Sequence, residues 1–392
     1  MKENLVTYQE QKKDVDFLPD YNSYLDNFLS INGFSLVDGI YSQKEYPMST
    51  QEKKVQQLAL EKLDNRFSLE SVFSKSGFKP VEPLGIINNG GNTLFISAGV
   101  QILDSVIHEE GCFISEPIFI SQPVLRTQYI DGISEGNSTS FINISTEAVN
   151  VNPQEHFNYL QNWLNIFYGF GMESSKFTFT HRAVDKTWGD KIFNGLELFI
   201  YYDGLEIGDA SFNYGVAQKT RDVINFSDIG FGLERIKWVI RGGSYFDNFI
   251  SKKYPESSLS SLAFANTLSL LAGSGLNPSN KEHGYRLRLF SKRFIDEVKG
   301  QYQDFDDLFL ENYRYWLKWT KLPVSEIDSL EIIKKENERN FNRLLLDHLK
   351  DNYTDVGLEI NIPTNILLSR LNGTSVPRDL IDKLLFNLNY KK

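Results

Sequence analysis

The sequence predicts an α+β protein in which an antiparallel sheet flanked by helices is followed by an all-helical region. Between about residues 84 and 235, short runs rich in β-branched and aromatic residues recur, bounded by Gly, Asn, Ser or Pro. Few helical crossovers separate these runs, and this favours antiparallel pairing. Beyond residue 229 the pattern is almost wholly helical. We therefore divide the chain into residues 1–67, 68–245 and 246–392.

The strands and the main helix of the middle region are predicted from local patterns. The segment "NPQEHFNYLQNWLNIFYGFG" (152–171) has apolar residues spaced by three and four and ends in glycine, which predicts one helix. Residues 1–67 are charged and aromatic, with helix-like stretches and no chemical motif. The strand-like runs are "TLFIS", "EPIFISQPVL", "TSFINIS", "KFTFTH", "LELFIYYDG" and "LEIGDASFNY".

Composition limits the class of protein. Apolar residues make up 41% and charged residues 23% of 392 residues, as in ordinary globular proteins. No apolar run reaches a membrane span and the N-terminus lacks a signal-peptide core, so we expect a cytoplasmic protein. The one cysteine, Cys112, excludes an intramolecular disulfide and a thiolate-rich zinc site, and no zinc is expected. The net charge of −10 argues against nonspecific coating of nucleic acid but permits a local basic groove.

The segment "FSDIGFGLERIKWVI" (226–240) joins a strand-like run to a helix-like run across a Gly-x-Gly turn. Gly230 and Gly232 allow a ligand to approach the backbone, and a helix N-terminus favours anions. Arg235 adds a fork of donors suited to phosphate oxygens. The alternative is a tight turn followed by an exposed Glu234–Arg235 pair.

Further charged residues lie near this segment in the predicted sheet. Arg126 ends the run "SQPVLR" and is either a second phosphate ligand or an ordinary surface arginine. Regular alternation along "LEIGDASF" places Glu206 and Asp209 on opposite faces of the strand. Acids here could bind Mg²⁺ or a substrate ammonium group, or simply face solvent. The candidate acids are Asp185, Asp190, Glu197, Asp203, Glu206, Asp209 and Asp228.

The segment "KEHGYRLRLFSKRFIDEVKG" predicts an amphipathic helix in the C-terminal region. Its cations Arg286, Lys292 and Arg293 fall close to one side of that helix, and Leu287, Phe290 and Phe294 fall on another. Such a face is either a contact for nucleic acid or a solvated surface.

Taken together, these residues resemble a known family. "SDIGFGLERI" resembles motif 3 of class II aminoacyl-tRNA synthetases, and its form D-x-G-x-G-L-E-R-I resembles alanyl-tRNA synthetase. Other segments are similar to that family in the same order, and the resemblance extends from residue 69 to about residue 390. These segments are "FSKSGFKPVEPLGIINNGGNTLFISAGVQILDSV" (73–106), "ISQPVLR" (120–126), "LEIGDASF", "LNPSNKEHGYRLRLFSKRFI" (276–295) and "LNGTSVPRDLIDKL" (371–384).

The resemblance implies a class II synthetase-type sheet and a role for each matching residue. Arg235 would bind the outer phosphates of ATP and Arg126 the α-phosphate, with Gly230 and Gly232 beside them and Phe141 near adenine. Asp228 would bind the substrate amino group, and Trp188 would form one wall of the amino-acid pocket. Asp209 takes the place of the family's asparagine in that pocket. Glu206 is the candidate Mg²⁺ ligand. The candidate tRNA-binding residues are Arg286, Arg288, Lys292 and Arg293.

The implied function is ATP-dependent activation of alanine or another small amino acid as its adenylate, followed by transfer to an acceptor, with tRNA expected. One alternative is an adenylate-forming ligase whose acceptor is a carrier protein or a small molecule. Another is a non-catalytic paralogue that senses an amino acid or tRNA. The chain differs from the family because "GDKIFNGLEL" lacks the Gly-Pro-Cys pattern of the alanine pocket and the loop after Arg126 is shorter. The family's editing and C-terminal oligomerising domains have no counterpart here, and residues 1–67 have no assigned role.

Overall fold

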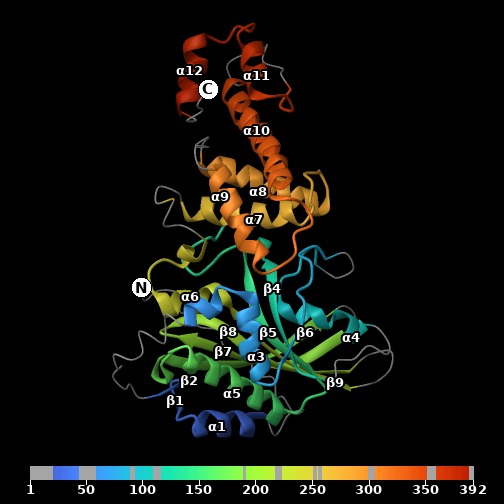
Figure 1. Cartoon of the computed structure of the whole chain (residues 1–392), viewed down its shortest axis with the longest axis vertical. Coiled ribbons are helices and arrows are strands. Elements are labelled where there is room, and N and C mark those ends of the chain that lie inside the picture. Colours follow the sequence, from blue (N-terminus) through green and yellow to red (C-terminus); the bar gives the residue numbers. More distant parts are fainter. Residues whose placement is uncertain are drawn as a thin grey trace.

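A nine-stranded open sheet forms the body of the protein in the computed structural model (Figure 1). The strand order is β1-β2-β6-β7-β8-β9-β5-β4-β3, and every pair is antiparallel except β3 with β4. The predicted α+β class and the antiparallel sheet are confirmed. The structure describes residues 21–43, 59–88, 93–108, 116–188, 191–216, 223–249, 254, 258–298, 305–350 and 359–387.

The central strands correspond to the sequence runs that predict them, with one exception. "TLFIS" forms no strand, and its Phe95 makes only an isolated bridge with Ile87. The strands are β1 (Ser35–Val37), β2 (Ile40–Ser42), β3 (Lys79–Pro80), β4 (Ile118–Leu125), β5 (Ser140–Val149), β6 (Phe177–Trp188), β7 (Lys191–Tyr202), β8 (Leu205–Val216) and β9 (Val223–Gly232).

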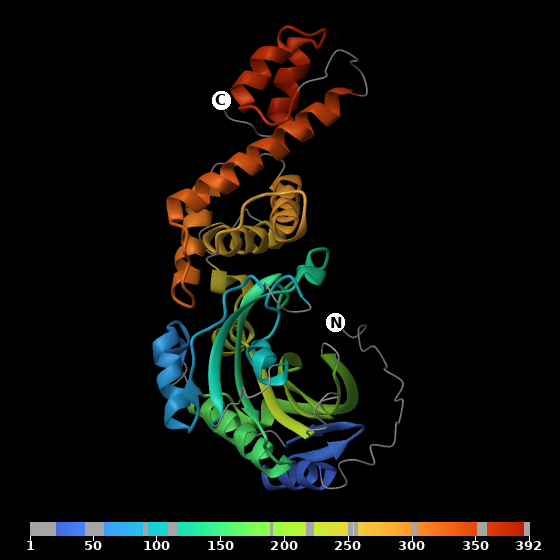
Figure 2. The same cartoon turned by 90° about the vertical axis from the view of Figure 1, so that its right-hand side faces the viewer.

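One face of this sheet is covered by helices and is apolar. Helix α5 (Pro153–Gly169) matches the predicted helix, and a capping box between Asn152 and Glu155 begins it. Its Trp163 lies 4.5 Å from the ring of Phe231 on β9. Helices α1 (Tyr21–Ile31) and α3 (Arg66–Lys75) lie against the same layer (Figure 2). Burial of these aromatic rings supplies the main driving force for folding of the body.

The described part of the N-terminal segment is built into this body. The hairpin β1–β2 adds to the sheet because Tyr41 of β2 pairs with Phe179 of β6. Tyr21 of α1 is fully buried and its ring lies 5.1 Å from the ring of Phe157 on α5. Residues 21–42 therefore complete the edge of the sheet and the layer beneath it.

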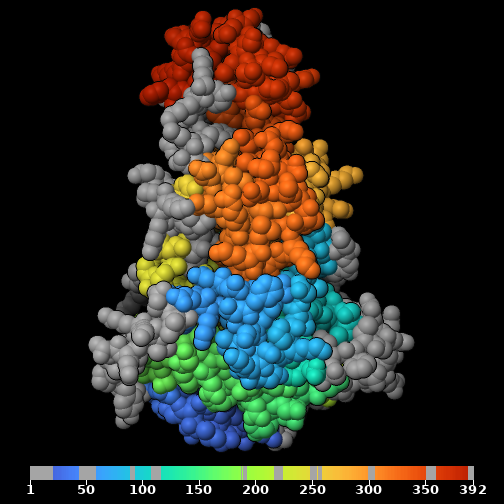
Figure 3. Space-filling view, in the orientation of Figure 1, coloured from blue at the N-terminus to red at the C-terminus, as the bar shows by residue number. Residues whose placement is uncertain are grey.

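A stack of helices continues beyond the sheet, as the sequence predicts. Helix α7 (Leu259–Gly273) is almost entirely buried and packs against α8 (Glu282–Val298), α9 (Phe305–Leu317) and α10 (Glu326–Lys350). Helices α11 (Thr364–Leu371) and α12 (Arg378–Asn387) form the narrow end farthest from the sheet (Figure 3). Among the described residues, no helix is long and apolar enough to cross a lipid bilayer.

Polar contacts join the helical stack to the sheet near the start of β5. The hydroxyl of Thr267 on α7 lies 2.7 Å from the Thr139 hydroxyl and 2.8 Å from the Ser140 hydroxyl. The Asn266 amide also donates to Ser140. Because all of these groups are buried, the hydrogen bonds fix the stack relative to β5.

Candidate functional site

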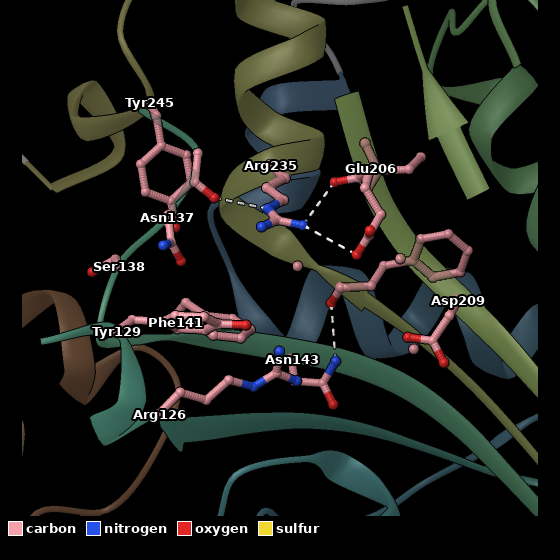
Figure 4. Close-up of a pocket in the computed structure, with 16 residues that line it drawn as sticks. Arg126, Tyr129, Asn137, Ser138, Phe141, Asn143, Glu206, Asp209, Arg235 and Tyr245 are labelled. Carbon is pink, nitrogen blue, oxygen red and sulfur yellow. Dashed lines mark hydrogen bonds and ion pairs between the residues drawn. The ribbon is translucent and has the colours of Figure 1, made fainter. Parts of the chain in front are cut away.

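A pocket opens on the sheet face opposite α5, where β5, β8 and β9 meet the start of α6 (Leu233–Arg241) (Figure 4). It encloses about 490 Å³, including its open mouth. Its lining combines two arginines, two acids, aromatic rings and glycine backbone. The lining residues are Arg126, Tyr129, Gly136, Asn137, Ser138, Phe141, Asn143, Glu206, Ile207, Gly208, Asp209, Gly230, Phe231, Gly232, Arg235 and Tyr245.

Arg235 is fixed in this pocket by two backbone carbonyls. Its Nε donates to Gly136 O at 2.8 Å, and its NH1 donates to Glu206 O at 2.8 Å. The carboxylate Oε1 of Glu206 lies 3.7 Å from the same nitrogen. These contacts hold the guanidinium at the pocket with remaining N–H groups available for an anion.

Arg126 approaches the pocket from a different element, at the end of β4. Its Nε donates to Ser97 O at 3.1 Å, and its guanidinium carbon lies 5.0 Å from the centre of the Phe141 ring. This cation–π contact places the arginine over Phe141. The structure thus brings together Arg126, Phe141 and Arg235, which are far apart in the sequence.

Gly230 and Gly232 do not form the turn that the sequence predicts. Both lie in extended β9, which leads directly into α6, and Gly232 has φ −78°. The role of Gly230 is spatial, because a Cβ there would lie 3.2 Å from the Asn143 amide nitrogen, whereas a Cβ on Gly232 would come no closer than 3.6 Å to Arg235. The glycines give the pocket a flat floor on which a ligand can lie close to the backbone.

Glu206 and Asp209 lie on the same face of β8, contrary to the prediction from regular alternation. The register with β7 shifts between Ile200, which pairs with Gly208, and Tyr201, which pairs with Glu206. Ile207 is therefore the extra residue of a β-bulge, and the bulge reverses the side on which Glu206 projects. Both acids line the pocket as a result.

Beyond the pocket, a cluster of acids continues across the same face of the sheet. Asp228 of β9 pairs with Glu147 on one neighbouring strand and with Ser211 on the other. Loss of water raises the pKa of Asp209 to about 6 and the pKa of Asp228 to about 7. The negative charge of Asp209 also raises the pKa of Asp228, whereas Lys186 lowers the pKa of both acids. Burial also raises the pKa of Glu147 well above its usual value. A ligand ammonium would stabilise the ionised forms of these acids.

Lys186 reaches this acid cluster from β6. Its Nζ lies 2.8 Å from Glu197 Oε1 and donates to Ser211 Oγ at 3.2 Å. Burial alone would lower the pKa of Lys186, but Asp228 and Glu197 raise it. Glu197 also accepts two hydrogen bonds from Arg182, so its charge is shared between two cations.

Trp188 lies near the far end of the acid cluster. Its Nε1 donates to Asp104 Oδ1 of α4 (Asp104–His108) at 2.8 Å. Its ring lies 5.7 Å from Phe226, which is two residues before Asp228 on β9. Trp188 is not among the residues that line the pocket, and its role as a wall of the amino-acid site stays a prediction.

Glu234 does not form the exposed pair with Arg235 that the alternative interpretation requires. It is fully buried, and its carboxylate accepts from the backbone N–H of Ile142 and from the Tyr315 hydroxyl of α9. Burial raises the pKa of Glu234 to about 7. Glu234 thus links the strand that carries Phe141 to the helical stack.

The candidate tRNA-binding residues of α8 do not form one basic face. Arg293 contacts Asp131 in the loop after Arg126, with 2.6 Å between NH2 and Oδ1. Arg288 contacts Glu336 of α10 instead, with 3.5 Å between Nε and Oε1. Leu287, Phe290 and Phe294 are buried as the amphipathic pattern predicts.

Several residues of this face belong to no sequence motif that would mark them as site residues. Glu147, Asn143, Lys186 and Asn213 join the site only because the strand registers align them. The one available signal is alternation, since Asn143, Ser145 and Glu147 are polar at every second position of β5.

The part of the chain that the structure describes contains no metal site formed by protein side chains alone. Among the described residues, no three His, Cys, Asp or Glu side chains lie close enough to hold an ion together. Mg²⁺ is usually bound by one or two carboxylates together with substrate phosphates. Glu206, half-exposed at the pocket mouth, fits that manner of binding. No protein-family model and no curated protein sequence matches this chain, so the assignment of its family stays a prediction.

Proposed function

We propose that the protein is a class II synthetase-like ligase that activates an amino acid with ATP and transfers it to an acceptor. The observation that carries the proposal is the meeting of Arg126 and Arg235 in one pocket whose lining also includes Asp209. Two cations suit the phosphates of a nucleotide, and acids suit an ammonium group. These groups lie along one sheet face, which suits a ligand that carries both.

The phosphates would lie between the two arginines. Arg235 donates to the outer phosphates from α6, and Arg126 contacts the α-phosphate from β4. Adenine would lie near Phe141, which already stacks with Arg126. Because both guanidinium groups are fixed before the ligand arrives, little reorganisation is needed to stabilise developing negative charge.

The amino acid would lie deeper on the same face, with its ammonium group at Asp228 and Asp209. Its carboxylate oxygen attacks the α-phosphorus of ATP. The bond from that phosphorus to the bridging oxygen then breaks, and pyrophosphate leaves. The protein contributes mainly positioning and electrostatic stabilisation to this reaction.

Mg²⁺ fits the proposal as an ion that enters with the nucleotide, held by Glu206 and phosphate oxygens. Its contribution when bound is to neutralise phosphate charge. Glu206 is oriented for this by Arg235, which binds its backbone carbonyl and approaches its carboxylate.

The proposed acceptor is tRNA, whose terminal hydroxyl would attack the adenylate carbonyl and release AMP. The helical stack beside the pocket supports this choice. One observation favours the smaller acceptors as a second candidate: Arg288 and Arg293 are each paired with an acid, which weakens α8 as a phosphate-binding face.

The first test is ATP–pyrophosphate exchange with the purified full chain, Mg²⁺ and single amino acids. We expect exchange that depends on one amino acid and is lost in Arg126→Ala. A folded protein that binds ATP and exchanges with no amino acid, with or without total tRNA, would contradict the proposal. The non-catalytic sensor would then be the better interpretation.

The acceptor is tested separately by tRNA binding at several salt concentrations. If tRNA is the acceptor, Arg286→Ala and Lys292→Ala should each reduce the salt slope by about one per lost phosphate contact. Unchanged binding in both variants, or no binding in the parent, supports the carrier-protein or small-molecule acceptor.

A further inference from the structure

Asn213 of β8 is a buried amide with no partner for either of its polar atoms. Its side chain is fully buried, and neither Oδ1 nor Nδ2 makes a hydrogen bond. Buried amides in folded proteins are nearly always hydrogen-bonded, because an unpaired group forfeits its hydration. A donor and an acceptor at the same place therefore indicate a ligand group that supplies both.

The neighbours of Asn213 on the sheet offer its amide no side-chain hydrogen-bonding partner. Across the sheet it pairs with Gly195 on β7 and with Phe226 on β9. A Cβ on Gly195 would lie 2.7 Å from Asn213 Oδ1, so glycine at this position makes room for the Asn213 amide itself. The ring of Phe226 packs against Trp188 and Phe193. These apolar neighbours strengthen any hydrogen bond made to the amide.

Asn213 lies one row deeper than the proposed ammonium site. Ser211 is directly opposite Asp228, and Asn213 follows Ser211 on the same face of β8. Successive rows on one face of a strand are about 7 Å apart. An amino acid whose ammonium group contacts Asp228 would thus direct its side chain past Ser211 toward Asn213.

The charges along this path favour a neutral polar side chain. Lys186, the cation nearest to Ser211, is already paired with Glu197 and lies in the field of Asp228 and Asp209. An anionic side chain would face these acids, and a purely apolar side chain would leave Asn213 unpaired. A carboxamide avoids both costs, because it donates to one amide atom of Asn213 and accepts from the other.

We propose that the amino acid activated here carries a carboxamide side chain of about the length of glutamine or asparagine, and that Asn213 recognises this carboxamide through hydrogen bonds. The proposal rests on the proposed function, since it assigns the substrate class of the same site. The side chain would pass Ser211, whose hydroxyl accepts from Lys186, and the Asn213 amide would make the discriminating contact.

The experiment compares aminoacyl-sulfamoyl adenosines, which are stable analogues of the adenylate, by calorimetry with the full chain. The series carries glutamine, asparagine, methionine, leucine, glutamate, glycine and alanine side chains. We expect a carboxamide analogue to bind at least about tenfold more tightly than methionine or leucine analogues, because apolar isosteres leave polar groups unpaired. Asn213→Leu should remove this preference and leave ATP binding unchanged.

Asn225→Leu is the matched control, because Asn225 pairs with Tyr214 and projects from the other face of the sheet. It should keep the preference for the carboxamide. Equal binding of apolar and carboxamide analogues overturns the inference and means that water satisfies Asn213. Tightest binding of the glutamate analogue overturns it in favour of recognition by Lys186.

Binding of the alanine or glycine analogue alone overturns the carboxamide assignment and leaves adenylate formation intact. Binding of none of the analogues overturns the proposed function together with this inference. The comparison in the parent protein needs no substitution, so a poorly folded variant does not weaken the test.

Discussion

The two faces of the nine-stranded sheet use alternate residues of the same strands for opposite purposes. On the face covered by α5, Phe212 and Phe231 are fully buried in an aromatic layer. On the other face, the adjacent positions of the same strands hold Ser211, Asp228 and Gly230. The first face lowers the free energy of the folded state through apolar burial, and the second concentrates charges that oppose folding.

This comparison assigns stability to the apolar face of the sheet and the proposed function to its polar face. Burial favours the protonated forms of Asp209 and Asp228, as their raised pKa values indicate. Such a surface persists because the opposite layer stabilises the sheet, and ligand charges can then compensate the acids. Substitutions on the two faces should therefore have different consequences.

The largest expected effect on stability is on the apolar face. Phe167→Ala in α5 removes a fully buried ring that contacts Phe177 and Phe231, and we expect the free energy of unfolding to fall by about 3–5 kcal/mol. Urea unfolding measures it. Phe386→Ala, at a side chain that is 80% exposed, should change it by less than about 0.5 kcal/mol. Equal effects of the two substitutions would contradict the assignment of the core.

The largest expected effect on function is at the pocket. Arg126→Ala and Arg235→Ala should each slow ATP–pyrophosphate exchange by about 10²–10³-fold, because each removes a fixed donor to developing negative charge. Unfolding curves should stay close to that of the parent. Arg314→Ala, at a surface pair with Glu326 on the helical stack, is the control and should keep full exchange. If Arg235→Ala exchanges normally, the phosphate assignment is wrong.

A smaller effect is expected for the proposed ammonium site, and it depends on pH. Asp228→Asn should weaken amino-acid binding by about 10–100-fold at pH 8, since a hydrogen bond to a charged group is lost. In the parent, affinity should rise as pH rises through about 6 to 7, because Asp209 and Asp228 then ionise while the ligand ammonium stays charged. Calorimetry from pH 5 to pH 8 measures both. An affinity that is flat across this range would exclude these acids as the binding groups. The other titratable groups beside them are Glu147, Lys186 and Glu197.

A smaller effect on stability than at the apolar face is expected at the link between the sheet and the helical stack. Tyr315→Phe removes a donor to Glu234, and we expect a loss of about 1–3 kcal/mol in the free energy of unfolding at pH 8. The pKa of Glu234 is raised to about 7 in the folded protein, so its contribution to stability is complete below its ordinary pKa and is lost as pH rises through 7. The loss in the variant should therefore be smaller at pH 5. Tyr285→Phe, at an exposed ring, is the control.

Local chemistry determined much of the fold. The capped helix at 152–171, the strands from β4 to β9 and the buried stripe of α8 follow from residue patterns and short-range hydrogen bonds. Such patterns depend on neighbours within a few residues, and the sequence contains them completely. "TLFIS" failed as a strand because no partner strand is available to it beyond one bridge.

The site depends on tertiary structure to a greater extent than the secondary structure does. The sequence by itself predicted Arg126, Arg235 and Asp228 as candidates, but their meeting requires β4, β9 and α6 to be aligned by strand pairing. Only the register with β7 revealed the bulge at Ile207 that turns Glu206 into the pocket, because alternation assumes a regular strand. The burial of Glu234 beneath Tyr315 and the unpaired amide of Asn213 were likewise decided by packing between distant segments, which no local pattern encodes.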